Sequence, residues 1–509
     1  MEIEQVRRRE REIERELQKE VWAIKEIAEK RGLRFCPVNF EIITKKAMVE
    51  FGTYVLPSRY SHWTFGKDFG KLQKLHELGI LQILEMVINT EPAVAFLLDS
   101  NTLVEHRMVI AHVFAHVDFF TNNYWFSKTN KKMLAESEHA EKRVAELEYE
   151  YGKEEIEKVL DACLSIQWHV DFYSEFKSNT EKKKVIPVLS MKSLGLDLEL
   201  GDNGKSDYGK SGEKKESIMN EKWENKDNKD DEKRYNQGRM KNGEVEVEGK
   251  KLRSKEELEC KEEKEEKDLL KYLIKNAPLK DYEMEILEIV RDETLYFMPN
   301  GLTKIMNEGW ATYWHVELMK EYLSFEDFQR FAQKHAELMS SEGLNPYKLG
   351  YMIYDSIVKR WDKEYGEGAG LKKIFEVREF EDDVSFINNY LTQDICDTCG
   401  LFVYEEDPYS GERRIKSTNV EDIKKKIISQ ILNFGKPLIV VKDGDYRGNR
   451  ELYLLHKYDG RELDRVYAED VLKAIYRLWK RPVHVETVYR EKRSLFSYDG
   501  KEHSLRDLE

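Results

Sequence analysis

Hydrophobic residues recur every three or four positions over much of this chain, which is the pattern of amphipathic helices. In the first half of the chain, this pattern covers residues 1–31, 69–88, 104–120, 132–151 and 153–168. In the second half, it covers residues 268–297 with a break near Pro278, then 302–322, 325–339 and 347–364. The spacing therefore predicts a mainly α-helical core made of two parts, residues 1–178 and 268–400.

The pattern changes near residue 405. Short runs rich in β-branched and aromatic residues are typical of strands, and they lie at 437–441, 451–456 and 482–488. A helical segment, 468–479, lies between the second and the third of these runs. We therefore predict that residues 405–509 form a small C-terminal α/β module that folds separately.

Residues 179–267 lie between the two helical regions and contain few hydrophobic positions. Lys, Glu, Asp, Asn and Gly dominate this segment. It can bury too little apolar surface to offset the entropy that ordering the chain would cost. We therefore predict a charged, disordered insert, which is either an inert insertion or a tether that binds a partner.

Composition narrows the possible function classes. The chain has 509 residues and a formal net charge of −14, so a general affinity for nucleic-acid phosphates is disfavoured. Its five cysteines are too few for a dense disulfide framework. The first residues are charged throughout, and the longest apolar runs, such as 93–98, are far too short to span a bilayer. We therefore expect a cytoplasmic protein without a membrane span.

A pair of histidines, His112 and His116, lies within the predicted helix 104–120. Residues four apart share one face of a helix, so the two imidazoles can bind one metal ion. The alternative is that both are hydrogen-bonded core residues. Val113 stands where the HExxH motif of zinc peptidases has its catalytic Glu, so this is not a standard HExxH site.

A second motif, NEGWATYWH, covers residues 307–315. Glu308 and His315 are seven residues apart, so they lie two turns apart on one helix face. A Glu from a second helix is a usual completion of a zinc site with two histidines. We therefore take His112, His116, Glu308 and His315 as candidate metal ligands. The alternative is an aromatic helix that packs its tryptophans in the core.

Three carboxylates near these motifs are candidates for a catalytic base: Glu85, Asp118 and Glu293. Each lies in or beside an apolar stretch. A carboxylate that is buried without a partner costs several kcal/mol, so each needs a cation, a metal or a hydrogen-bond donor. Taken singly, each is also compatible with a structural or surface role.

Several longer segments carry a family resemblance. They are RYSHWTFGKDF (59–69), LEMVINTEPAVAFLLDSN (84–101), AHVFAHVDFFTNNYWFSKTN (111–130), APLKDYEMEILEIVRDETLYFMPNGLTKIMNEGWATYWH (277–315) and, in the C-terminal module, NFGKPLIVV and LWKRPVHVET. Together they resemble the stage V sporulation protein R (SpoVR) family over nearly the whole chain outside the insert. The chain departs from the family pattern at residues 78–84 and at Ala115, where Gly is common.

The resemblance implies a role linked to formation of the spore cortex, which is a peptidoglycan layer. It also implies two partners, a serine protein kinase and a protein with a von Willebrand-type domain, but it names no reaction. Three function classes follow. The first is a metal-dependent hydrolase in which the candidate ligands hold zinc or another divalent metal. The second is a non-catalytic assembly or regulatory protein that acts with the kinase. The third is a metalloprotein that does not hydrolyse its ligand.

Overall fold

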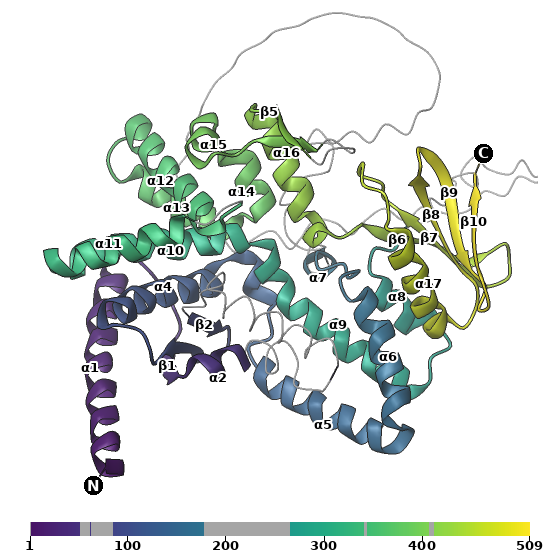
Figure 1. Ribbon diagram of the computed structural model, residues 1–509, viewed down its shortest axis with the longest axis horizontal. Helices are drawn as coiled ribbons and strands as arrows, with labels where there is room; N and C mark the ends of the chain where they lie inside the picture. Colours follow the sequence, from purple (N-terminus) through teal and green to yellow (C-terminus); the bar gives the residue numbers. More distant parts are fainter. Residues whose placement is uncertain are drawn as a thin grey trace, which may run out of the picture. The chain divides into compact units, whose positions relative to one another are not determined.

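The computed structural model (Figure 1) describes residues 2–50, 62, 85–177, 265–340, 344–406 and 412–508. The helices before the insert are α1 (Glu2–Lys30), α2 (Lys45–Glu50), α4 (Leu103–Asn122), α5 (Met133–Tyr151), α6 (Lys153–Ile166) and α7 (Ser174–Lys177). Those after it are α8 (Leu269–Asn276), α9 (Asp281–Leu302), α10 (Lys304–Tyr322), α11 (Phe325–Met339), α12 (Pro346–Tyr365), α13 (Ala369–Phe380), α14 (Asp383–Tyr390), α15 (Gln393–Cys399), α16 (Val420–Ile431) and α17 (Arg465–Trp479).

The strands of the described residues form three sheets. They are β1 (Val38–Ile43), β2 (Glu85–Ile88), β3 (Ala93–Leu98), β4 (Val403–Glu406), β5 (Arg413–Ser417), β6 (Ile439–Tyr446), β7 (Glu451–His456), β8 (Val483–Tyr489), β9 (Lys492–Tyr498) and β10 (His503–Asp507). The predicted fold class, a mainly helical core with a C-terminal α/β module, is confirmed. Two elements, α11 and β7, have the predicted bounds.

The predicted helix 69–88 is wrong at its end, because Glu85–Ile88 form β2. Residues 69–84 lie outside the described residues. Strand β2 pairs antiparallel with β3, and β1 pairs parallel with the other edge of β3. Strand β1 is distant from β3 in the sequence, and helical spacing alone does not reveal such a pairing. The pairing places Glu85 at one end of a three-stranded sheet beside α4.

Helix α4 is the central element of the helical core. Thr102 and Glu105 form a capping box that satisfies backbone N–H groups at its start. Every residue from Met108 to Phe120 is buried. Because α4 is apolar on all sides rather than on one stripe, neighbouring elements must surround it. Its polar side chains therefore lie in the interior, where they need specific partners.

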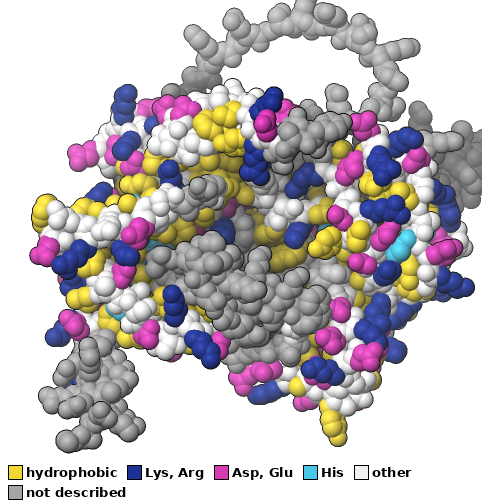
Figure 2. Space-filling view, in the orientation of Figure 1, with side chains coloured by type: hydrophobic (Ala, Val, Ile, Leu, Met, Phe, Trp, Pro, Cys, Tyr) yellow, Lys and Arg dark blue, Asp and Glu magenta, His cyan; other side chains and the backbone are white. Residues whose placement is uncertain are grey.

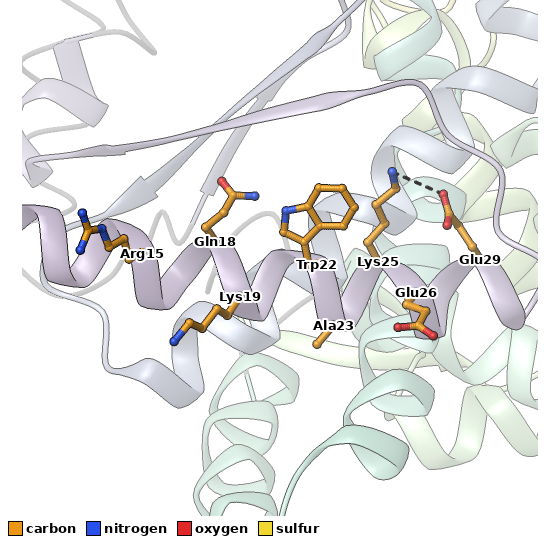
Figure 3. A pocket seen from close by; sticks show the side chains of 8 residues that line it. All are labelled: Arg15, Gln18, Lys19, Trp22, Ala23, Lys25, Glu26 and Glu29. Carbon is orange, nitrogen blue, oxygen red and sulfur yellow. Dashed lines mark ion pairs between the residues drawn. The ribbon is translucent and has the colours of Figure 1, made fainter.

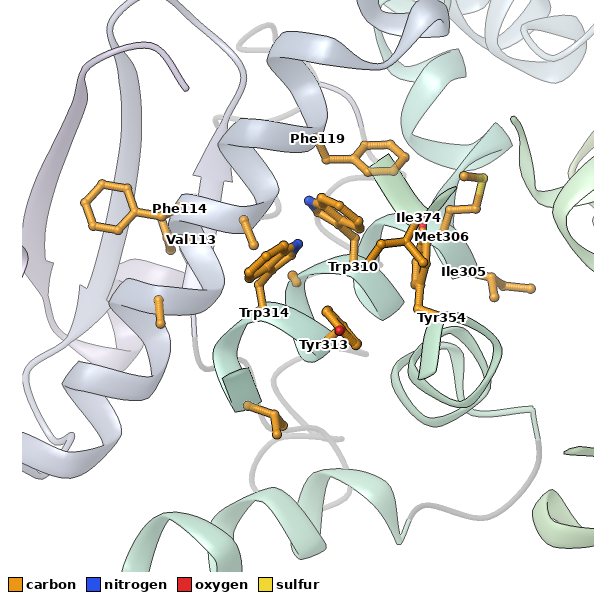
Figure 4. Packing of buried hydrophobic residues seen from close by; sticks show 14 of the residues in the cluster. Val113, Phe114, Phe119, Ile305, Met306, Trp310, Tyr313, Trp314, Tyr354 and Ile374 are labelled. Atoms are coloured by element: carbon orange, nitrogen blue, oxygen red, sulfur yellow. The ribbon is translucent and has the colours of Figure 1, made fainter. Parts of the chain in front are cut away.

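Helices α10 and α12 pack unusually closely, and two glycines permit this. A Cβ at Gly309 would lie 2.4 Å from the Cα of Gly350, which is too short for any real contact. The close approach turns the aromatic side of α10 into the core. There Trp310 and Trp314 are fully buried and pack against α12 and α13 (Figure 4).

The C-terminal sheet has the order β10-β9-β8-β7-β6, and α17 joins the parallel strands β7 and β8. One face of this sheet and α17 share a cluster of buried hydrophobic residues with α6, α8 and α9. Two ion pairs, Lys480–Glu283 at 2.6 Å and Arg477–Glu155 at 2.8 Å, cross the same boundary. Separate folding of residues 405–509 stays a prediction. A module cut away from the rest would expose the hydrophobic residues of this shared cluster to water.

The predicted insert, 179–267, lies outside the described residues except at its end. There Glu266 forms an antiparallel bridge with Val441 of β6. Among the described helices, none is both long enough and apolar enough to cross a membrane. Figure 2 shows basic and acidic side chains interspersed over the described part of one face.

A shallow surface recess follows the outer side of α1 (Figure 3). Its centre is Trp22, which is 64% exposed. Lys25 and Glu29, which also line the recess, form an ion pair at 3.6 Å. All of the lining residues come from this one helix, so the recess does not gather groups from several elements as a catalytic site does. The chemistry-bearing residues meet elsewhere.

Candidate metal centre

Three of the candidate ligands and one candidate base come from three elements that meet in the helical core. Helix α4 supplies His112 and His116 on the side that contacts α10. Helix α10 supplies Glu308, and Glu85 is the first residue of β2. Both histidines are buried, and only 13% of the Glu85 side chain and 19% of the Glu308 side chain are exposed. The structure thus brings together four of the residues predicted from the sequence.

The atoms of these side chains approach one another at similar distances. His112 Nε2 lies 3.5 Å from Glu85 Oε1 and 3.7 Å from Glu308 Oε2. Glu308 Oε2 lies 3.5 Å from His116 Nε2. One ligand atom from each of Glu85, His112 and His116 also lies within 4.8 Å of the other two. Each contact therefore joins two atoms that can bind a metal.

These distances fit a tetrahedral metal ion better than direct hydrogen bonds. Zinc bonds of about 2.0–2.2 Å to nitrogen or carboxylate oxygen place neighbouring ligand atoms about 3.3–3.6 Å apart. Hydrogen bonds between nitrogen and oxygen are shorter than this. Among the described residues, His112 Nε2 and Glu308 Oε2 are buried and have no hydrogen-bond partner. An ion between them would satisfy both atoms.

Electrostatics at the cluster also favour a cation. Burial raises the pKa of Glu85, and the charge of Glu308 adds to this shift. Burial lowers the pKa of His116 to about 4, so this imidazole is neutral. Burial acts against the charged forms of His112 and Glu308 too, but the charges of Glu85 and Glu308 raise the pKa of His112, and the two histidines lower that of Glu308. The two buried carboxylates thus favour positive charge beside them, which a divalent ion would supply.

The remaining ring nitrogen of each histidine on α4 has a partner. His116 Nδ1 lies 2.9 Å from Asn307 Oδ1, and an amide oxygen can only accept, so this Nδ1 carries the proton. His112 Nδ1 lies 2.9 Å from His315 Nδ1. His315 Nε2 lies 3.0 Å from His335 Nδ1. Both nitrogens of His315 therefore contact other imidazoles, which places His315 behind His112.

Tyr347 belongs to the centre although sequence reasoning did not identify it. Its ring centroid lies 6.1 Å from that of His112. Burial, together with the charges of Glu308 and Glu85, raises the pKa of Tyr347. Its hydroxyl is therefore protonated at neutral pH and can donate a hydrogen bond. Tyr347 lies at the start of α12, and no motif connects it with the histidines.

Asp118 lies on α4 but is engaged elsewhere. It is fully buried and accepts hydrogen bonds from the backbone N–H of Arg34 at 2.7 Å and from Trp310 Nε1 at 3.0 Å. Arg378 Nε lies 3.6 Å from Asp118 Oδ2, the oxygen that Trp310 also contacts. Burial raises its pKa to about 6, while Arg378 acts in the opposite direction. Asp118 thus joins α4, α10 and α13.

We predict that Asp118→Ala destabilises the fold by about 3–5 kcal/mol, because it leaves Arg378 buried without its counterion. Urea unfolding followed by circular dichroism measures this change. Asp470→Ala is the matched control, since Asp470 is 68% exposed on α17 and should change stability by less than about 0.5 kcal/mol. Equal effects of the two substitutions would contradict a structural role for Asp118.

Glu293, the third candidate base, is half-buried on α9. It is not one of the groups that meet at the histidine pair. Glu85 is therefore the candidate base that the structure places beside the histidines, at 3.5 Å from His112.

Comparisons with known proteins agree with this architecture. The family profile described as SpoVR like protein matches residues 11–436, and that of the SpoVR-like C-terminal domain matches residues 437–490. The chain is similar to the uncharacterized protein YcgB of Escherichia coli (strain K12), with 28% identity over 487 residues that cover 88% of this chain and 87% of that protein. No solved structure matches the chain. Since the two profiles together span nearly its whole length, this chain belongs to the SpoVR family.

Proposed function

We propose that this chain is a metal-dependent hydrolase whose ligands are His112, His116 and Glu308. The observation that supports it most strongly is the buried pair His112 Nε2 and Glu308 Oε2, which face each other at 3.7 Å without a hydrogen-bond partner among the described residues. Two histidines and one glutamate form a ligand set of catalytic zinc sites, which leave one position open. Zinc fits this set, and other divalent metals that accept nitrogen and oxygen ligands remain candidates.

Zinc in such a site supplies a Lewis acid and a bound water that ionises near neutral pH. Side chains of the protein would then accept and donate protons and orient the substrate. Glu85 is the carboxylate beside the ligands, and its raised pKa favours a group that can accept a proton and return it. The protonated hydroxyl of Tyr347 could donate to a substrate carbonyl oxygen as negative charge develops there. The surrounding core limits access of bulk water.

The substrate class that we propose is a peptide or amide, and cell-wall peptides are the first to test. The support is the family name, which links SpoVR proteins to sporulation and so to the peptidoglycan of the spore cortex. The serine protein kinase and the von Willebrand-type protein stay expectations that co-purification from the host would test.

The test begins with metal analysis of the full chain purified without a polyhistidine tag. We expect about one equivalent of bound metal per chain. The same protein is then assayed on peptides and on peptidoglycan fragments, with and without a chelator, and cleavage that the chelator abolishes would support hydrolysis. Glu85→Gln should keep the metal but lose activity if Glu85 is the base and not a ligand.

The outcomes separate the three function classes. Protein without metal would refute the centre and favour the assembly or regulatory role. Stoichiometric metal without cleavage of any substrate would favour a metalloprotein that is not a hydrolase.

A further inference from the structure

Three imidazoles form a continuous chain from the centre of the core to helix α11. His112 Nδ1 lies 2.9 Å from His315 Nδ1, and His315 Nε2 lies 3.0 Å from His335 Nδ1. His112 and His315 are buried, whereas His335 is half-buried. The three residues come from α4, α10 and α11. Both contacts have hydrogen-bond length, so each requires one donor and one acceptor.

We propose that His315 and His335 are positioning residues that fix the tautomer of His112 and thereby present its Nε2 to the metal. This inference rests on the proposed metal centre. It assigns neither residue to the ligand set, and it includes His335, which lies twenty residues beyond the motif that contains His315.

The hydrogen-bonding capacity of imidazole fixes the direction of hydrogen bonding along the three histidines. A neutral imidazole has one N–H donor and one bare acceptor nitrogen. If His112 Nε2 is bare, its proton is on Nδ1, which donates to His315 Nδ1. His315 then carries its proton on Nε2 and donates to His335 Nδ1. One choice at the first ring therefore sets the tautomers of all three rings.

The opposite direction would place a proton on His112 Nε2. That N–H would be buried, and its nearest carboxylate oxygens are 3.5 and 3.7 Å away, beyond hydrogen-bond length. A metal ion and a proton cannot share this nitrogen, so a bound metal excludes that direction. The direction that leaves Nε2 bare is therefore the one compatible with the proposed metal centre.

Packing holds the second and third rings in place. Phe331 of α11 is fully buried and contacts both rings. It meets His315 edge to face at 5.7 Å and lies nearly parallel to His335 at 5.8 Å. These contacts restrict the rotation of both rings. The packing thus supports their orientation, which is the role of residues that position metal ligands.

The two histidines on α4 differ in how their tautomers are fixed. His116 donates to Asn307 Oδ1, which is an acceptor in its own right. His112 instead donates to an imidazole whose own proton must point away, toward His335. Loss of His315 should therefore affect His112 and leave His116 unchanged.

The experiment uses the full chain with Co²⁺ as the probe ion. Paramagnetic Co²⁺ shifts the N–H protons of ligating imidazoles far from the rest of the proton spectrum. We expect two such exchangeable signals in the wild type, one from His112 and one from His116. In His315→Leu, the His112 signal should be lost to exchange with water, and Co²⁺ affinity should fall about ten- to a hundredfold.

Two further variants separate positioning from ligation. His315→Asn keeps an acceptor oxygen near the place of Nδ1, so it should restore most of the affinity and the second signal. His335→Leu changes a half-buried ring, so it tests the positioning role even if His315→Leu does not fold. It should speed the exchange of the His112 proton with water. His139→Leu, at an exposed histidine of α5, is the control and should change neither readout.

Each outcome has one meaning. A wild type that binds no Co²⁺ would refute the metal centre itself. A wild type that binds Co²⁺, with unchanged affinity and signals in both His315→Leu and His335→Leu, would refute the positioning chain alone. Loss of Co²⁺ from His315→Asn as complete as that from His116→Leu would make His315 a ligand and would also overturn the inference.

Discussion

His116→Leu is expected to lose its bound metal while the chain stays folded. Without metal, the substitution removes a buried polar ring, roughly conserves volume and leaves Asn307 Oδ1 without its donor, which costs about 1–3 kcal/mol. With metal, it removes one of the ligands that share the ion. Loss of a ligand should lower metal affinity by about a hundredfold or more, since even loss of a supporting residue costs about ten- to a hundredfold. Metal analysis and thermal unfolding of the same sample measure the two effects.

His106→Leu is the matched control, because His106 is also a buried histidine of α4. Burial lowers its pKa, as it does for His116, but His106 is not one of the clustered ligands. We expect this variant to keep one equivalent of metal. If both variants or neither variant lost the metal, the specific role of His116 would be wrong.

Gly309→Ala is expected to destabilise the fold by more than about 3 kcal/mol, which is large for the addition of one methyl group. The added Cβ would lie 2.4 Å from backbone atoms of Gly350, which cannot rotate away as a side chain can. Helices α10 and α12 would have to separate, and the aromatic core around Trp310 would open (Figure 4). Helix propensity has the opposite sign, because Ala favours a helix over Gly by about 1 kcal/mol.

Urea unfolding shows whether the steric conflict or the helix propensity has the larger effect on stability. Gln333→Ala, at an exposed position of α11, is the control for propensity without steric conflict and should change stability by less than about 0.5 kcal/mol. Higher stability of Gly309→Ala than of the wild type would show that α10 and α12 do not pack at this distance. Because Glu308 is the neighbouring residue, loss of metal should accompany the loss of stability.

Much of the fold could be predicted because most helices carry their own signal. Long helices such as α9–α12 have apolar faces at regular spacing, and their observed ends lie close to the predicted ones. The three-stranded sheet could not be predicted this way. Its strands are short, and β1 and β3 pair although about fifty residues separate them. The apolar residues before Glu85 suited a helix as well as a strand, so the pattern was ambiguous there.

The candidate site could be predicted to a similar degree. Spacing identified His112 and His116, because four residues make one helical turn, and Glu308 followed from the chemistry that two histidines require. Spacing could not show which turns of α10 pack against which turns of α4. This register places Glu308 beside His116 and His315 behind His112. Tyr347 and His335 lie on other helices, and only the packing of α10, α11 and α12 brings them near.

The insert divides the proposed ligand set in the sequence. His112 and His116 precede residue 178, whereas Glu308 follows residue 264, and the described residues on both sides belong to one compact unit. A metal bound at this centre would therefore cross-link two separate stretches of chain, and its binding free energy would add to their association. A cut within the insert would yield two pieces that each carry an incomplete set of ligands. A bound metal would then add to the hydrophobic contacts between α4 and α10 in holding the two pieces together.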